Sequence, residues 1–262
     1  MKNINPIGIF DSGVGGLSVA RHIRKELPGE NLLYVADSFH APYGSKPQEF
    51  IERRSIKLVE FLLEKKAKAI VVACNTATVS AIQQLRSIYS VPIIGIEPGV
   101  KPATLTSKTK VVGVLATTQT VNSKAFNYLA KRFTSEIKIE VQACPGLVEQ
   151  VEICNLHGDE TKALIRQYVH PLLQKGADTI VLGCTHYAFL IPAIKEIVGS
   201  EINVINTAQA VAKEVERRLS TEGLLSLCDD FGSEFFWTSG EESVAKKTIS
   251  TLWGKTVNVS QI

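Results

Sequence analysis

The fold is decided by one stretch that occurs twice, as KAIVVACNT at Lys68–Thr76 and as DTIVLGCTH at Asp178–His186. Each copy is a run of β-branched and small apolar residues that ends at a cysteine, Cys74 or Cys184, with a polar residue after it. A short apolar run followed by amphipathic sequence is typical of a strand buried on both faces of a parallel sheet. Because the stretch repeats at an offset of 110 residues, we expect one such sheet in each half of the chain.

The alternation of apolar runs with amphipathic stretches extends along most of the chain. The runs predict strands at Pro6–Phe10, Leu32–Ala36, Ala69–Ala73, Pro92–Ile96, Lys110–Ala116, Ile137–Val141, Thr179–Leu182 and Asn203–Ile205. The amphipathic stretches predict helices at Gln48–Lys66, Ala77–Ile88, Lys124–Phe133, Glu160–Gln174 and Gln209–Leu219. Strands that alternate with helices in this way form parallel sheets covered by helices on both faces, so the predicted class is α/β.

Two further pairs of segments repeat in the same order. IGIFDS at 7–12 resembles VGVLAT at 112–117, and VPIIGIE at 91–97 resembles EINVIN at 201–206, with offsets of 105 and 110 residues. Three matches in one order indicate two copies of a unit of about 100 residues. We therefore predict two domains, the last segment packing back on the first: residues 1–97 plus 208–262, and residues 98–207.

Length, charge and composition limit the class of protein. The 262 residues are 45% hydrophobic with a net charge of +3, a globular balance that is neither disordered nor strongly basic. No apolar run approaches the ~20 residues of a membrane-spanning helix, and the N-terminus lacks the apolar core of a signal peptide. We therefore expect a cytoplasmic protein that binds neither membranes nor nucleic acid.

Ligands of parallel α/β sheets bind beyond the carboxyl ends of the strands, so the residues after each strand form the candidate site. They are Asp11-Ser12-Gly13, Asp37-Ser38, Cys74-Asn75-Thr76, Glu97-Pro98, Thr117-Thr118 and Cys184-Thr185-His186. The Tyr43-Gly44 turn after the second strand could present a backbone N–H and an aromatic wall to a ligand. The repeat makes Cys74 and Cys184 equivalent, each before a predicted helix start that should lower a thiol pKa. Two like acid–base groups on opposite faces of one carbon suit the inversion of a stereocentre.

The remaining cysteines give no sign of a metal site or a disulfide framework. There are five cysteines in all, an odd number with no CxxC pair, so free thiols in a reducing compartment are expected. Cys144, Cys154 and Cys228 lie outside the repeated segments, and we expect them to be structural. The histidines likewise lack metal-ligand spacing, so no metal is expected.

A glycine-rich segment supports a different interpretation. GVGGLS at 13–18 opens a helix after the first strand, and Asp37 ends the next strand, which partly imitates a dinucleotide-binding fingerprint. Ser18 occupies the third glycine position, and Asp11 would repel a pyrophosphate while suiting a cationic amine. A nucleotide-dependent oxidoreductase is therefore kept only as an alternative.

Several motifs together resemble those of the glutamate racemases. They are FDSGVGGL at 10–17, AD at 36–37 leading to PYG at 42–44, ACNTA at 73–77, CPGLV at 144–148 and GCTHY at 183–187. The resemblance implies two flavodoxin-like α/β domains related by a pseudo-twofold axis, with the active site in the cleft between them. It also implies cofactor-independent racemisation of L- and D-glutamate, which supplies D-glutamate for peptidoglycan.

The resemblance further implies residue roles. Cys74 and Cys184 would be catalytic, Cys74 acting on D-glutamate and Cys184 on L-glutamate, and the assisting acid–base groups would be Asp11, Glu152 and His186. The implied substrate-binding residues are Asp11, Ser12, Tyr43, Gly44, Asn75, Thr76, Thr185 and His186. The implied partner is glutamate as the small-molecule substrate, with no cofactor and no metal, and the oligomeric state stays open between monomer and homodimer.

Two further alternatives remain beside the oxidoreductase. An aspartate racemase of the same superfamily would share the fold and the cysteine pair, and it would fail to supply D-glutamate to a strain that needs it. A catalytically silent amino-acid-binding protein would bind its ligand equally well after both cysteines are replaced by alanine.

Overall fold

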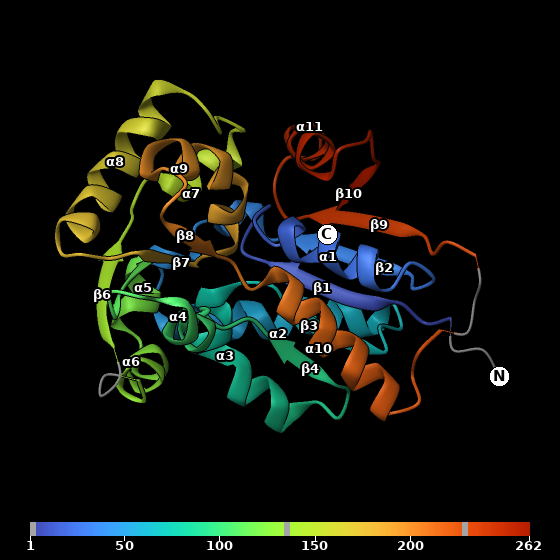
Figure 1. Cartoon of the computed structure of the whole chain (residues 1–262). Coiled ribbons are helices and arrows are strands. Elements are labelled where there is room, and N and C mark those ends of the chain that lie inside the picture. The colour runs from blue at the N-terminus through green and yellow to red at the C-terminus, as the bar shows by residue number, and fades with distance from the viewer. Residues whose placement is uncertain (1–3, 134–136, 227–229) are drawn as a thin grey trace.

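The computed structural model describes residues 4–133, 137–226 and 230–262, and its strands form two parallel sheets (Figure 1). The first has the order β10-β9-β2-β1-β3-β4, with β1 (Ile7–Asp11), β2 (Leu32–Ala36), β3 (Ala69–Val72), β4 (Ile93–Gly95), β9 (Glu234–Thr238) and β10 (Val259–Gln261). The second has the order β6-β5-β7-β8, with β5 (Val111–Ala116), β6 (Lys138–Ala143), β7 (Thr179–Gly183) and β8 (Asn203–Ile205). The predicted α/β class is confirmed.

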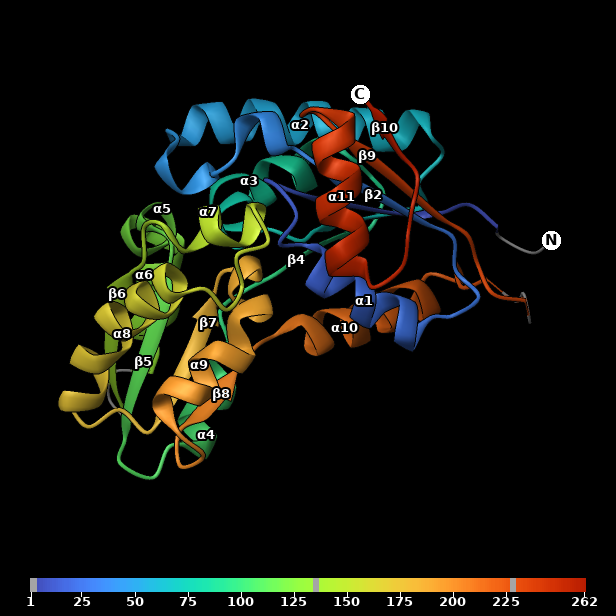
Figure 2. The same ribbon diagram turned by 90° about the horizontal axis from the view of Figure 1, so that it is seen from above.

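Helices cover both sheets (Figure 2). Around the first sheet lie α1 (Leu17–Glu26), α2 (Gln48–Glu64), α3 (Asn75–Ile88), α10 (Ala208–Thr221) and α11 (Glu242–Trp253). Around the second lie α4 (Val100–Thr106), α5 (Thr118–Asn122), α6 (Lys124–Lys131), α7 (Leu147–Glu152), α8 (Asp159–Gln174) and α9 (Ile191–Val198). Three short 3-10 turns are η1 (Ser38–His40), η2 (Tyr43–Ser45) and η3 (Thr185–Leu190). We call each sheet with its helices the first and the second half.

The central strands β1, β2, β3 and β7 are apolar almost throughout because they are buried on both faces. In β1, Ile9 packs in the same apolar cluster as Leu17 of α1, whereas Phe10 packs on the opposite face with Leu58 of α2. Successive side chains of a strand point to opposite faces, so a strand covered on both sides needs an apolar residue at every position.

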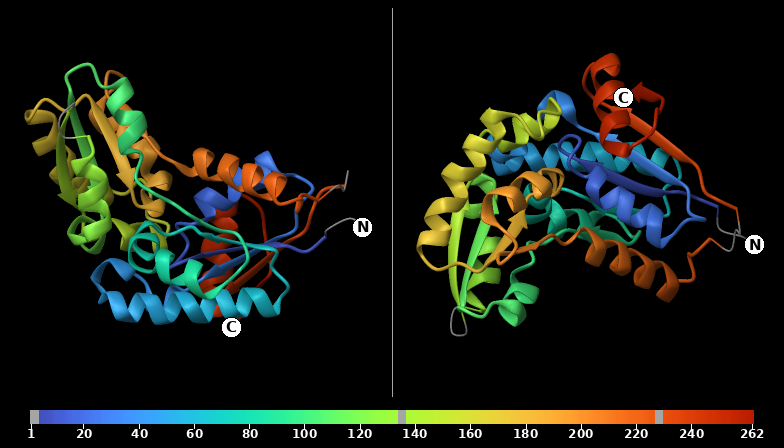
Figure 3. Two further views of the ribbon diagram at one scale, coloured as in Figure 1. Left: turned by 90° about the horizontal axis from the view of Figure 1, so that it is seen from below. Right: turned by 45° about the horizontal axis from the view of Figure 1, so that its top comes forward.

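The two halves share one strand order. β2-β1-β3-β4 corresponds to β6-β5-β7-β8, so β3 and β7, which carry the repeated stretch, occupy the same place in their sheets. The C-terminal segment adds to the first sheet, since β9 pairs in parallel with β2 and α10 packs along α1. Figure 3 shows this C-terminal segment, coloured orange and red, packed with the first half of the molecule.

The strand pattern did not predict β9 and β10, and no helix was predicted at α11. These elements lie beyond the repeated segments, so no second copy pointed to them. β10 is an edge strand whose Ser260 and Gln261 are exposed, and it therefore shows no apolar run.

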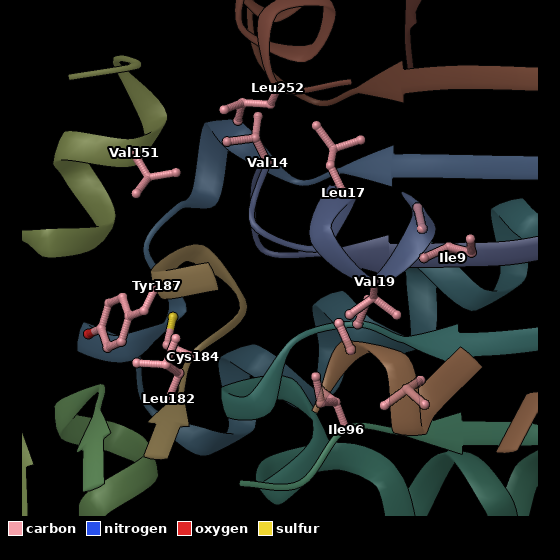
Figure 4. Close-up of a cluster of buried hydrophobic side chains, with 14 of the residues drawn as sticks. Ile9, Val14, Leu17, Val19, Ile96, Val151, Leu182, Cys184, Tyr187 and Leu252 are labelled. Atoms are coloured by element: carbon pink, nitrogen blue, oxygen red, sulfur yellow. The ribbon is translucent and has the colours of Figure 1, made fainter. Parts of the chain in front are cut away.

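The apolar core is continuous from one half to the other. One cluster joins Val14, Leu17 and Leu252 of the first half to Cys184 and Tyr187 of the second (Figure 4). The carboxyl ends of β1 and β7 are thereby held at the junction of the halves.

Candidate active site

Cys74 lies where β3 ends and α3 begins. Its backbone is extended, and its sulfur accepts the N–H of Ala77 at 3.4 Å, which caps the helix. The thiol donates to the hydroxyl of Ser12 across 3.7 Å, and the residue is only 5% exposed. A thiol that caps the helix after a buried strand is fixed at the edge of the sheet where ligands bind.

Cys184 occupies the equivalent point after β7. Its backbone is also extended, and its Sγ lies 3.8 Å from Nδ1 of His186. The chain continues as the 3-10 turn η3 instead of the expected α-helix, and α9 begins only at Ile191. The tighter turn places the ring of His186, two residues later, beside the sulfur.

Asp11 ends β1, and its carboxylate connects the two halves. Oδ1 accepts the Ser12 hydroxyl at 3.0 Å and the Gly13 N–H at 2.9 Å, and Oδ2 accepts the Thr185 hydroxyl of the second half at 2.7 Å. Burial raises the pKa of Asp11, although the charge of His186 and the hydrogen bond from Thr185 oppose the rise. Asp11 therefore orders two of the predicted substrate-binding hydroxyls.

His186 and Glu152 form a hydrogen-bonded pair beside Cys184. Nε2 of His186 lies 2.7 Å from Oε1 of Glu152, which also accepts the N–H of Val14 at 2.8 Å. Burial disfavours the charged imidazole, but the hydrogen bonds to Cys184 and Glu152 and the charge of Asp11 outweigh it and raise the pKa of His186 well above its ordinary value. The ring of His186 therefore lies against the sulfur of Cys184, and its Nε2 also lies 3.2 Å from the backbone nitrogen of Gly15.

The glycine loop before α1 is filled by these same side chains. A Cβ added at Gly13 would lie 1.9 Å from Oε1 of Glu152, and one added at Gly15 would lie 2.2 Å from Nδ1 of His186. The glycines therefore admit protein side chains at the point where a dinucleotide fold admits a pyrophosphate. This packing leaves the oxidoreductase interpretation without support.

One electrostatic expectation is wrong. The helix start was expected to lower the thiol pKa, yet burial and the charge of Asp11 raise the pKa of Cys74, and the neighbouring Cys184 contributes in the same direction. The hydrogen bond from the Ala77 N–H opposes the rise without reversing it. Desolvation outweighs the helix terminus because it acts on the whole charge of a thiolate.

The predicted substrate-binding residues of η2 and α3 gather at the same junction. Tyr43 of η2 is 1% exposed, and Thr76 Oγ1 lies 2.9 Å from the hydroxyl of Thr117 in the second half. A Cβ on Gly44 would lie 2.8 Å from Cβ of Thr117, so the turn packs closely on that residue. Asn75 is buried, and no described residue hydrogen-bonds its Oδ1. An unpaired buried acceptor of this kind is suited to receive a ligand donor.

Sequence reasoning did not assign a role to several residues of the site. Thr117 and Thr120 form a buried hydroxyl cluster with Thr76, and Asp37 with Arg54 holds the hydroxyl of Tyr43. The repeat contained a signal for Thr117, because it aligns with Ser12 at the offset of 105 residues. No local pattern pointed to Arg54, which lies in the middle of a helix.

The other cysteines differ in their surroundings. Cys144 is buried with its thiol 3.3 Å from the carbonyl of Gln142, and it lines a small pocket with Gly44 and Thr117. Cys154 is half-buried, and Cys228 lies outside the described residues. Within the described part of the chain, no three His, Cys, Asp or Glu side chains form a metal-binding group, and no helix there is long and apolar enough to cross a membrane.

Comparison with known sequences extends over nearly the whole chain. Residues 7–215 match the model of the Asp/Glu/Hydantoin racemase family. The chain is 53% identical over 251 residues to a glutamate racemase of Methylococcus capsulatus, covering 96% of this chain and 93% of that protein. It is 46% identical over 257 residues to one of Pseudomonas aeruginosa, covering 98% and 97%.

Solved structures give the same result. A glutamate racemase isoform of Bacillus anthracis superposes with a TM-score of 0.90 at 32% identity, covering 99% of this chain and 98% of that one. The Escherichia coli glutamate racemase in complex with L-glutamate and the activator UDP-MurNAc-Ala superposes with a TM-score of 0.86 at 28% identity, covering 98% of both chains. The resemblance seen in the sequence motifs is confirmed, and the chain belongs to the Asp/Glu/Hydantoin racemase family.

Proposed function

We propose that this chain is a glutamate racemase, an isomerase that interconverts L- and D-glutamate without a cofactor. The observation that carries the proposal is the placement of Cys74 and Cys184 at equivalent strand ends on either side of the junction. Each sulfur has its own acid–base neighbour, Asp11 for Cys74 and the His186–Glu152 pair for Cys184. The family and the glutamate racemases among its relatives agree with this chemistry.

In the proposed reaction, one thiolate removes the Cα proton and the opposite thiol delivers a proton to the other face. With L-glutamate, the Cys184 thiolate accepts the proton and Cys74 donates its own, so that Cys184 ends as a thiol and Cys74 as a thiolate. The reverse reaction exchanges these roles. The ring of His186 lies 3.8 Å from the sulfur of Cys184, whereas burial and the charge of Asp11 raise the pKa of Cys74.

The substrate would be held by groups that the halves bring together. The Asp11 carboxylate suits the substrate ammonium, and Asn75 Oδ1 is an acceptor that lacks a partner among the described residues. The carboxylates would be bound by hydroxyl and backbone N–H donors at the starts of α3 and η3, where helix termini favour anions. We assign these roles to Asp11, Ser12, Tyr43, Gly44, Asn75, Thr76, Thr185 and His186.

The product would be the D-glutamate of peptidoglycan, and the compartment the cytoplasm. Both cysteines must stay reduced to exchange protons, and the four described cysteines are free thiols, as a reducing compartment would keep them. A homodimer is a further proposal, to be decided by light scattering on the purified protein.

The test is the optical rotation of each glutamate enantiomer with purified protein in EDTA and without added cofactor. Both enantiomers should converge on the racemate, and aspartate under the same conditions should stay unchanged. Racemisation of aspartate but not of glutamate would indicate an aspartate racemase instead. Binding of glutamate without turnover would indicate the silent binding protein.

A further inference from the structure

A second buried carboxylate lies beside the site, with no part in the proton transfer proposed above. Asp37 follows β2, and its backbone N–H donates to the carbonyl of Asp11 at 3.0 Å. The residue is 0% exposed. The Asp37 carboxylate therefore needs partners from the protein, since a buried charge without them is costly.

Side chains from η1, η2 and α2 supply those partners, and Ser239 after β9 adds a further hydrogen bond. Asp37 Oδ2 accepts the hydroxyl of Tyr43 at 2.5 Å and Nε of Arg54 at 3.0 Å. Oδ1 accepts Nη2 of Arg54 at 2.5 Å and lies 3.1 Å from Nδ1 of His40. Burial tends to raise the pKa of Asp37, but the hydrogen bonds from Arg54 and Tyr43 outweigh it and lower the pKa. The guanidinium of Arg54 binds both carboxylate oxygens of Asp37. This bidentate geometry is the stronger and more specific form of an arginine–carboxylate contact.

Tyr43 connects this ion pair to the site. Its ring is buried in the same apolar cluster as Cys74. The next residue, Gly44, packs on Thr117, which is hydrogen-bonded to Thr76. The hydrogen bond from the Tyr43 hydroxyl to Asp37 therefore holds in place a turn that contacts both halves of the candidate site.

We propose that Arg54 is a positioning residue for the substrate: through Asp37 it fixes Tyr43, and thereby the turn of Tyr43 and Gly44 against which glutamate binds. The inference rests on the proposed function. Arg54 touches neither thiol, so its loss should weaken binding more than proton transfer. Arg54→Lys keeps the positive charge but loses the bidentate contact with the Asp37 carboxylate. This variant should therefore keep only part of the wild-type substrate binding.

The experiment compares Arg54→Met, Arg54→Lys and Tyr43→Phe in the racemisation of both enantiomers. We expect Arg54→Met to raise KM about tenfold with kcat changed less than about threefold, and Arg54→Lys to fall between it and wild type. Combining Arg54→Met with Tyr43→Phe should add little to the larger single effect, because both changes release the same turn. Arg53→Met is the matched control, since Arg53 precedes Arg54 on α2 and is exposed.

Two precautions keep the result decisive. Arg54→Met leaves a buried carboxylate uncompensated, so Asp37→Asn/Arg54→Met is measured as well, and folding is checked by circular dichroism. An unchanged KM in the folded variants, or a fall in kcat alone, would overturn the inference. Absence of turnover in the wild-type chain would instead overturn the proposed function, and this inference with it.

Discussion

Gly15→Ala tests whether the position of His186 controls the reaction. The added Cβ would lie 2.2 Å from Nδ1, 2.6 Å from Cγ and 2.7 Å from Cε1 of the ring, and ordinary contact begins at 3.4 Å. The ring must therefore move by about 1.2 Å in a close-packed interior. It cannot do so without stretching its 2.7 Å contact to Glu152 or its 3.8 Å contact to Cys184.

The expected cost has two parts. Overpacking a buried site destabilises a fold by about 1–3 kcal/mol, so the variant should still fold at moderate temperature. A misplacement of about 1 Å in an acid–base group lowers the rate by about 100-fold. Because enantiomers have equal free energies, the equilibrium constant is unity, and kcat/KM must fall by the same factor in both directions.

The assay is the initial rate of racemisation from each enantiomer, normalised to folded protein by circular dichroism. Gly158→Ala is the matched control, because its Cβ would lie 2.1 Å from Oδ1 of Asn155 before α8, and Asn155 hydrogen-bonds with Gln150 and Thr161. It should keep nearly wild-type kcat/KM. A folded Gly15→Ala protein with wild-type kcat/KM would refute the role assigned to the His186 position.

Three other predictions follow from the same geometry. Cys74→Ala and Cys184→Ala should each abolish racemisation, whereas alanine at the other three cysteines should leave turnover measurable. In D2O, the first D-glutamate formed from protiated L-glutamate should carry deuterium at Cα while the remaining L-glutamate stays protiated, because the donor thiol exchanges with solvent; mass spectrometry showing protium in that product would exclude two separate bases. The pKa of His186 is raised above 6.5, so its protonation stabilises the fold fully below about pH 6.5 and less as the pH rises through the folded-state pKa. The melting temperature should fall over that alkaline range, and by less in Glu152→Gln.

The sequence predicted the fold, and the backbone position of the candidate site, for one physical reason. A parallel sheet covered on both faces leaves short, uninterrupted apolar runs, and the residue after each run must lie at the ligand-binding edge. The repeat then made Cys74 and Cys184 equivalent without any knowledge of side-chain contacts. The same argument placed Thr117 among the strand-end residues, and the repeat aligns it with Ser12.

Contacts between the halves were beyond such reasoning. Oε1 of Glu152 accepts the N–H of Val14, and Thr185 donates to Asp11, across 138 and 174 residues of chain. These bonds depend on how the two sheets are oriented, which neither local pattern nor repeat spacing encodes. The pKa of Cys74 was misjudged for a related reason, since burial depends on the whole packed junction.

The repeat also concealed an asymmetry between the two strand ends. Two thiols in identical surroundings would be equally able to act as the base or as the acid. Burial and the charge of Asp11 raise the pKa of Cys74, whereas Sγ of Cys184 lies 3.8 Å from Nδ1 of His186. The neighbours therefore differ in charge at positions where the backbone is the same. The fold supplies two equivalent strand ends, and the residues around them place a carboxylate near one sulfur and an imidazole against the other.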